Sequence, residues 1–155
     1  MYVKTKHFGD IELEEDKIIT FESGIMGFED KLNYTILFDI EEGEKPIISW
    51  LQSVEEPGLA IPVINPLYVK DDYNPTVEDE LLKTLGNLND DNILVLLTVT
   101  VPSDITKVTA NLKAPFIINS DTRKGCQVIV ENSDYPVKYN VYEAIQKLKQ
   151  TKGEE

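Results

Sequence analysis

The chain is poor in the side chains that build disulfides and metal clusters. Its 155 residues include one cysteine, Cys126, and one histidine, His7. A single thiol cannot form an internal disulfide, which is typical of proteins kept in a reducing cytoplasm. One thiol and one imidazole are also too few for a zinc site built from thiolate and imidazole ligands.

Basic residues are scarce as well. The 15 Lys and Arg residues are outnumbered by 28 Asp and Glu residues, which gives a net charge of -13 at pH 7. A surface of that charge repels phosphate backbones, so we expect no direct binding of nucleic acid. The charge favours a basic protein as partner, because opposite charges steer association.

Long hydrophobic runs are missing too. The first residues lack the apolar core of a signal peptide, and the most apolar stretch, 93–101, is interrupted by Thr98 and Thr100. We therefore expect a cytoplasmic protein that is not exported through a signal peptide and does not span a membrane. The length suits one domain, which we expect over residues 1–150, followed by a frayed polar tail over residues 151–155.

The residues that are abundant are those that favour strands. Ile, Val and Thr supply about a quarter of the chain, whereas Ala is rare. Alternating runs bounded by turn residues predict strands at 10–14, 17–22, 34–40, 46–53, 59–64, 93–101, 105–112, 116–119 and 126–131. Pro62 cannot donate a ladder hydrogen bond, so we expect it at an edge or a bulge. The pattern predicts a mainly β fold: an antiparallel, partly closed β-barrel with two short capping helices.

Only two segments have helical periodicity. In the first, Thr76 is placed to cap a helix whose third residue is Asp79 and which ends near Leu85, before Gly86. The second lies near the C-terminus and begins at Asn140. It has an apolar stripe at helical spacing, formed by Val141, Ala144, Ile145 and Leu148. We expect these two helices to cap the barrel.

Motifs that would indicate catalysis are hard to find. Gly24 and Gly27 lack the Lys and Ser or Thr of a phosphate-binding loop, and we assign them to a turn. We expect His7 to be a surface or strand-end residue and Cys126 to be a structural thiol, because no activating partner is apparent for either. We therefore expect no catalytic residue, metal or cofactor.

Two other functions remain open: one uses adjacent carboxylates, and the other is supported by the β content and the aromatic residues. The pairs are Glu14 with Glu15, Glu41 with Glu42, Glu55 with Glu56, Asp71 with Asp72, and Asp90 with Asp91. Neighbours on a strand point to opposite faces, so most of these acids are expected to be solvated turn charges. The alternatives are a small β-barrel hydrolase that uses a carboxylate pair, and an oligosaccharide-binding module like an OB-fold.

Two acidic clusters also contain or adjoin aromatic residues. Glu55 and Glu56 occupy a Pro-Gly turn that follows the strand of the only tryptophan, Trp50. Asp71 and Asp72 lie between two tyrosines in YVKDDY at 68–73. Aromatic side chains supply much of the energy of protein interfaces, while charges orient the partner. Both clusters are therefore candidate surfaces for a basic, partly apolar protein.

Three blocks carry a more specific combination of motifs. They are ITFESGIMGFED at 19–30, WLQSVEEPGLAIPVINPLYVKDDY at 50–73, and VTVPSDITKVTANLKAPFIINSDTRKGCQVIV at 99–130. In this order they resemble the FliW family of flagellar assembly factors. Met26 departs from the family, which usually has proline in its GIPGF turn, and we expect a looser turn here. Cys126 occupies a position where lysine is common before Gln127.

The resemblance implies a cytoplasmic, non-enzymatic regulator. FliW-like proteins bind the flagellin monomer and, alternately, CsrA, a small basic RNA-binding dimer that represses translation of flagellin mRNA. Capture of CsrA relieves this repression, so flagellin synthesis follows flagellin export. The resemblance thus implies flagellin and CsrA as partners, with no direct nucleic-acid contact and no membrane contact.

The two partners call for different surfaces. A basic CsrA would be attracted by the acidic residues Glu55, Glu56, Asp71 and Asp72. The amphipathic ends of flagellin would need an apolar groove, to which we expect Phe28, Tyr68 and Tyr73 to contribute.

Overall fold

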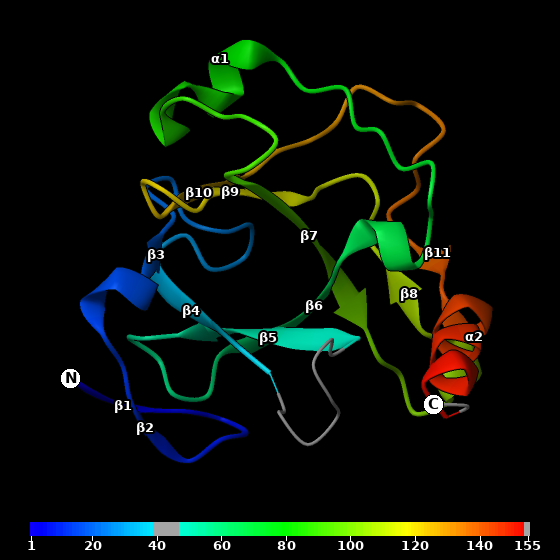
Figure 1. Ribbon diagram of the computed structural model, residues 1–155, viewed down its shortest axis with the longest axis horizontal. Helices are drawn as coiled ribbons and strands as arrows, with labels where there is room; N and C mark the ends of the chain where they lie inside the picture. The colour runs from blue at the N-terminus through cyan, green and yellow to red at the C-terminus, as the bar shows by residue number, and fades with distance from the viewer. Residues whose placement is uncertain (39–46, 154–155) are drawn as a thin grey trace.

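Seven strands close into a mixed β-barrel in the computed structural model, which describes residues 1–38 and 47–153, with side chains as far as Gln150 (Figure 1). The barrel strands are β3 (Ile19–Thr20), β4 (Asn33–Leu37), β5 (Ile48–Ser53), β6 (Ala60–Ile64), β7 (Ile93–Thr100), β9 (Phe116–Asn119) and β10 (Lys124–Gln127). Around the barrel they follow the order β7-β6-β5-β4-β3-β10-β9, and pairing of β7 with β9 closes the ring. A closed ring leaves fewer exposed strand edges.

The prediction of a mainly β barrel is confirmed, with two refinements. The barrel is closed rather than partly open, because residues Ile93 to Leu96 of β7 pair with β9. One pair is parallel: β10 meets β3 at Lys124 and Thr20, where the Thr20 amide donates to the Arg123 carbonyl at 2.9 Å. Strands 100 residues apart in the chain are thereby joined, and periodicity alone does not reveal such a pairing.

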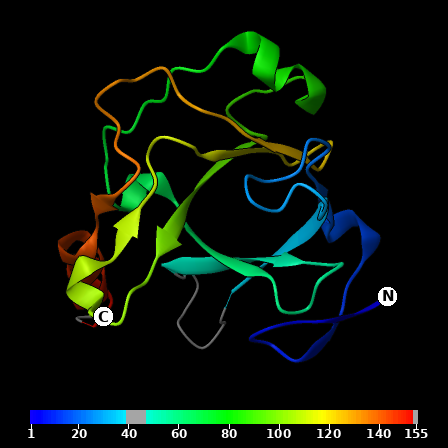
Figure 2. The same ribbon diagram turned by 180° about the vertical axis from the view of Figure 1, so that it is seen from behind.

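The remaining elements surround the barrel, as the view from behind also shows (Figure 2). A hairpin of β1 (Tyr2–Lys4) and β2 (Asp10–Glu12) lies beside it, while β8 (Thr109–Ala110) and β11 (Tyr139–Asn140) extend the sheet from β7. The 3-10 turns are η1 (Glu15–Lys17), η3 (Pro66–Tyr68), η4 (Lys83–Leu85) and η5 (Ile105–Lys107), and the helices are α1 (Asp79–Leu82) and α2 (Tyr142–Gly153). None of these described helices is both long and apolar enough to cross a membrane.

Two apolar cores lie on the two sides of β7. Inside the barrel, the Phe21 ring packs edge to face against Tyr34 and Phe116, with ring centroids 5.5 and 5.7 Å apart. Between the sheet and α2, a second core contains Leu97 and Ile145. Because β7 separates the two cores, Leu96 and Leu97 are both buried although they face opposite sides.

The predicted elements lie close to the observed ones, but several begin or end at other residues than predicted. The first helix begins at Asp79 rather than after Thr76, because the Thr76 amide donates to the Asn132 side chain and its carbonyl accepts from Glu131. That helix is followed by η4 and ends as predicted at Leu85, where Gly86 has a φ of 83°.

The predicted strand 105–112 begins as η5 and only Thr109–Ala110 pairs. The strand predicted at 126–131 instead spans Lys124–Gln127, although Val128 and Val130 beyond it are buried. Pro62 lies within β6 before the pairing with β7 starts at Val63, so its missing N–H falls where β6 has one neighbour, as predicted.

At the C-terminus, the Asn140 side chain accepts from the Tyr142 amide at the start of α2, which confirms the predicted start. The helix then runs through Gly153, into the segment predicted as a frayed tail. Parts of two predicted strands, 39–40 and residue 46, together with the acidic pair Glu41 and Glu42, lie outside the described residues.

Candidate functional site

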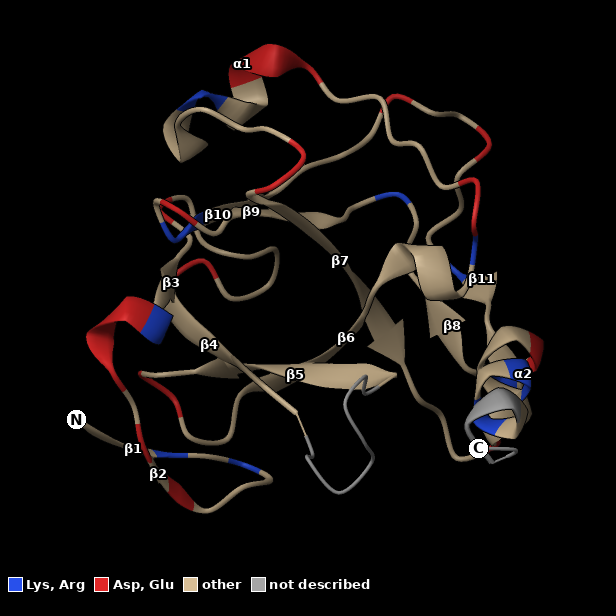
Figure 3. Cartoon of the chain, viewed as in Figure 1, with Lys and Arg blue, Asp and Glu red and all other residues tan. Residues whose placement is uncertain are grey.

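The acidic residues predicted to form one counter-surface occupy two separate places. Glu55 and Glu56 lie in the turn between β5 and β6, whereas Asp71 and Asp72 follow η3 on the other side of the barrel (Figure 3). Figure 3 also shows acidic segments at η1 and α1 and basic segments on α2, so the negative charge is spread around the molecule. The candidate site is therefore two grooves, each with its own aromatic residue.

The first, which we call the Tyr68 groove, lies between η3 and α2. The sequence NPLY at 65–68 forms a capped 3-10 turn: the Asn65 side chain accepts from the Leu67 amide at 3.0 Å, and Pro66 follows it with its φ fixed. The turn leaves Leu67 57% exposed and Tyr68 half-buried. With Ala144 and Leu148 of α2, they border a groove of about 450 Å³.

Charged residues line the same groove. Lys70 pairs with Asp72 at 2.8 Å, and this contact holds the pKa of the Asp72 carboxyl below its usual range and raises that of Lys70. Lys70 also lies 5.8 Å from the centre of the Tyr135 ring. Asp71 is exposed and makes no ion pair within the described residues, so its charge is available to a partner.

The prediction that Tyr73 lines a binding groove is wrong for this structure. Tyr73 is only 8% exposed, its hydroxyl donates to the Leu112 carbonyl at 2.8 Å, and its ring stacks on Tyr135 at 4.9 Å. Burial raises its pKa above the usual range. The residue anchors the 68–73 segment to the second core, which in turn holds Tyr68 in place.

Glu55 also has a structural task. Its carboxylate accepts from the backbone amides of Leu32 and Asn33 at 2.9 and 2.8 Å, which lowers the pKa of the Glu55 carboxyl. These bonds join the β5–β6 turn to the loop before β4. Glu55 is therefore a clamp between two loops, and only its neighbour Glu56 is left with an uncommitted carboxylate.

The second groove, which we call the Phe28 groove, lies where those two loops meet β6. Phe28 is 39% exposed and faces Glu56, Ile61 and Pro62 across a hollow of about 540 Å³. The turn before Phe28 requires glycine at position 24, because the Cβ of any other residue would lie 2.6 Å from the Cα of Glu29. The predicted turn of Gly24 and Gly27 is confirmed, since both have positive φ values.

His7 and Cys126, the two residues considered for catalysis, make contacts that stabilise the fold. His7 packs on Trp50 with ring centroids 4.1 Å apart. Burial raises the pKa of the Cys126 thiol to about 11, and the thiol donates to the Leu81 carbonyl, so little thiolate is present at neutral pH. Among the described residues, no three His, Cys, Asp or Glu side chains gather in a group that could hold a metal.

A hydrolase that works through a carboxylate pair needs one acid with a raised pKa. In Glu55 and Asp72 the pKa is shifted the other way. The arrangement of these residues is better suited to binding a protein surface, with apolar contacts in a groove and charges at its rim.

Several groove residues were not identified from the sequence. Leu67 could have been, because a capped Asn-Pro turn displays the residues that follow the proline. Leu148 was assigned only to the apolar stripe of α2, and Lys6 enters the Phe28 groove from the N-terminal hairpin. Contacts between such distant segments depend on the tertiary fold.

Comparison with known proteins identifies the family. The model of the FliW protein family matches residues 2–141. The chain belongs to the FliW family. It is 59% identical to the flagellar assembly factor FliW of Lachnoclostridium phytofermentans over 155 residues, which are 99% of each chain. It is 55% identical over 148 residues to that of Lachnospira eligens, covering 95% of this chain and 98% of the relative.

The fold agrees with that of a FliW protein. A crystal structure of the flagellar assembly factor FliW matches with a TM-score of 0.82 and 33% identity, over 91% of this chain and 96% of the other. The chain is thus similar to flagellar assembly factors along nearly its whole length.

Proposed function

We propose that this protein is a non-enzymatic flagellar assembly factor that acts in the cytoplasm by binding two proteins in turn. It binds the flagellin monomer, and when flagellin has been exported it binds the translational regulator CsrA and relieves repression of flagellin mRNA. The family assignment carries this proposal. The two grooves support it, because such a partner switch needs binding surfaces and two competing equilibria, and no reacting group.

The Tyr68 groove is the proposed docking region for CsrA. A protein that binds RNA carries a basic surface, and this groove has an uncommitted carboxylate at Asp71 in a chain with a net charge of -13. Tyr68 and Leu67 beside it supply the apolar contact that a charge alone does not give. Association is then steered by charge and falls in rate as salt is added.

The Phe28 groove is the proposed docking region for flagellin. Its exposed ring and the neighbouring Ile61 and Pro62 form an apolar hollow that could accept the apolar face of an amphipathic helix. The Glu55 clamp and the turn at Gly24 hold this hollow in shape before the partner arrives. A groove that is already formed lowers the entropy cost of binding.

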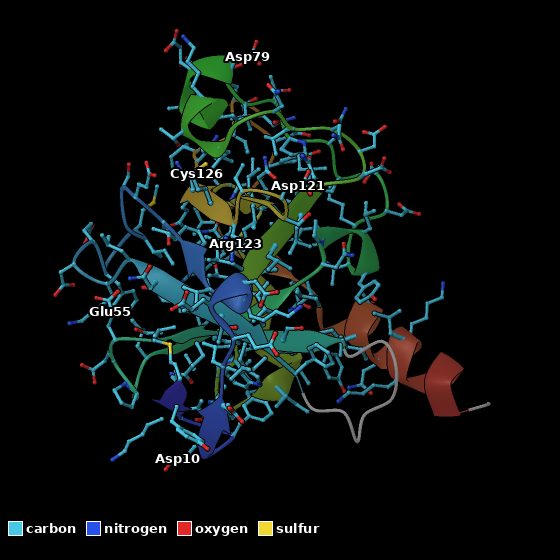
Figure 4. The ribbon with its side chains drawn as sticks, turned by 60° about the vertical axis from the view of Figure 1, so that its left-hand side comes forward. Asp10, Glu55, Asp79, Asp121, Arg123 and Cys126 are labelled. Carbon is cyan, nitrogen blue, oxygen red and sulfur yellow. The ribbon has the colours of Figure 1, made fainter. Side chains whose placement is uncertain are left out.

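Binding to purified CsrA and flagellin tests the assignment of each groove. We expect Asp71→Lys to weaken CsrA binding about tenfold and to leave flagellin binding within about twofold of the parent, because it reverses a rim charge in one groove only. Phe28→Ala should weaken flagellin about tenfold, since it removes a half-exposed aromatic contact. The matched control is Asp79→Lys, which makes the same charge reversal on α1 (Figure 4), at a residue that lines neither groove.

Biolayer interferometry at rising salt gives a second readout. The association rate with CsrA should fall with ionic strength for the parent and the Asp79→Lys variant, and less steeply for Asp71→Lys. An association rate that does not change with salt, or an equal loss of CsrA affinity in the two lysine variants, would place the CsrA-binding surface elsewhere. If neither protein binds the parent chain, the proposed function itself fails.

A further inference from the structure

A third hollow lies at the open end of the barrel and takes no part in the partner grooves. It encloses about 500 Å³, within the range of small-molecule sites, and continues into the barrel core. Its floor is formed by Ile19 and Ile118, which are 8% and 1% exposed. Ile11 and Leu13, in and just after β2, cover it from the side of the N-terminal hairpin. We call it the barrel-mouth pocket.

The lining decides what shape of molecule fits. Among the described residues, the apolar side chains around the pocket are all Ile or Leu, and no aromatic residue lines it. Aliphatic walls around a hollow at the mouth of a barrel suit a flexible alkyl chain better than a flat ring, which gains by stacking. The barrel-mouth pocket is therefore suited to an acyl chain.

Two cations stand at its rim. Lys17 and Arg123 line the pocket, and neither makes an ion pair with a carboxylate within the described residues. One guanidinium N–H of Arg123 (Figure 4) donates to the Glu15 carbonyl at 3.2 Å, which holds the side chain beside η1. The other N–H groups of the guanidinium can then donate to a ligand. Glu12 and Asp16 also line the pocket, so its rim carries two cations and two carboxylates in a strongly acidic protein.

The backbone of Arg123 adds a separate observation. Its φ is 59°, the one positive value of a non-glycine residue in the part of the chain that the structure describes. Glycine or asparagine adopts this conformation with less strain, yet an arginine occupies the turn. Strained positions of this kind cluster at ligand-binding sites.

We propose that the barrel-mouth pocket binds an aliphatic monocarboxylate, with the alkyl chain against the Ile and Leu walls and the carboxylate on the Arg123 guanidinium. Arg123 recognises the head group because a guanidinium can donate two parallel N–H bonds to a carboxylate. Lys17 is a second cation at the rim. This proposal does not depend on the proposed partners, so the pocket and the proposed function can each be refuted without the other.

Calorimetric titration of the whole chain with octanoate, decanoate and dodecanoate, each below its micelle concentration, tests the pocket. We expect one saturable site and about fourfold tighter binding for each added methylene that is buried. Decanol and decyltrimethylammonium, which keep the chain length and change the head, should bind at least threefold more weakly than decanoate. Absence of saturable binding, or equal affinity for the three head groups, would overturn the proposal.

Variants locate the site. Arg123→Asn keeps a residue that tolerates the left-handed turn and removes the guanidinium, so decanoate should bind about fivefold more weakly without a loss of melting temperature. Leu37→Trp fills part of the pocket and should weaken binding as well. Lys124→Met is the matched control, because Lys124 is the adjacent cation, pairs with Glu22 and does not line the pocket.

Methyl NMR gives a readout that does not depend on the variants. Decanoate should shift the methyl signals of Ile11, Ile36 and Ile118 and leave Leu67 and Leu148 of the Tyr68 groove unchanged. Shifts centred on the Tyr68 groove, or equal decanoate affinity in Arg123→Asn and the parent, would overturn the assignment.

Discussion

The Glu55 clamp offers a quantitative test of how the Phe28 groove is held. Glu55→Gln keeps the size of the side chain and removes the negative charge of the carboxylate, which accepts hydrogen bonds from the Leu32 and Asn33 amides at 2.9 and 2.8 Å. A hydrogen bond to a charged group contributes about 1.5–3 kcal/mol when it is shielded. Glu55 is exposed and glutamine retains one acceptor, so we expect a loss of about 1 kcal/mol in the free energy of unfolding at pH 7.

The pH dependence identifies the charge as the cause. The pKa of Glu55 is lowered in the folded protein, so its contribution is present above the unfolded pKa of about 4.3 and is lost as the pH falls through the folded value. The difference between the parent and Glu55→Gln should therefore be full at pH 7 and should shrink below about pH 4.

Urea unfolding followed by circular dichroism at both pH values measures this difference. Thermal melts should show a shift of about 2–4 °C at neutral pH. Glu56→Gln is the matched control, because Glu56 is the adjacent exposed acid without such bonds, and it should stay within about 0.5 kcal/mol of the parent. Equal stability of the two variants, or a gap that does not change with pH, would refute the clamp.

Four further substitutions test the fold by thermal or urea unfolding. Tyr34→Phe should raise stability by about 1 kcal/mol, because the buried Tyr34 hydroxyl has no hydrogen-bond partner among the described residues; a loss of stability would mean that the hydroxyl is satisfied. Gly24→Ala should cost more than about 2 kcal/mol through its clash with Glu29, whereas Gly27→Ala, with open space around it, should cost about 1 kcal/mol; equal costs would contradict this. Arg123→Gly should stabilise the chain by about 1 kcal/mol by relieving the positive φ, and a clear destabilisation would show that the arginine supports the fold.

Much of the barrel could be predicted from local pattern. The strand predicted at 93–101 is observed at Ile93–Thr100, because alternation of apolar residues reflects a buried face. The same rule failed at the two ends of the predicted segment, where Ile93 and Val101 are 41% and 53% exposed, since a strand face is buried only where something covers it.

The errors arise where distant segments compete with local signals. Thr76 has the sequence of a helix cap, yet its backbone pairs with Glu131 and Asn132, so the helix starts later. Tyr73 was predicted to contribute to an apolar groove, but its hydroxyl donates to the carbonyl of Leu112, 39 residues away in the chain. Burial of a tyrosine depends on such tertiary contacts, and for this reason the groove residues were only partly predictable.

The proposed function is that this protein couples the supply of flagellin to the translation of flagellin mRNA by exchanging partners. Its most direct test is a gel shift with labelled flagellin mRNA leader, CsrA, this protein and flagellin. We predict that the protein releases the RNA from CsrA and that an excess of flagellin restores the CsrA–RNA complex. A CsrA–RNA complex that is unaffected by the protein, or an RNA release that flagellin does not reverse, would show that partner exchange does not couple flagellin supply to translation.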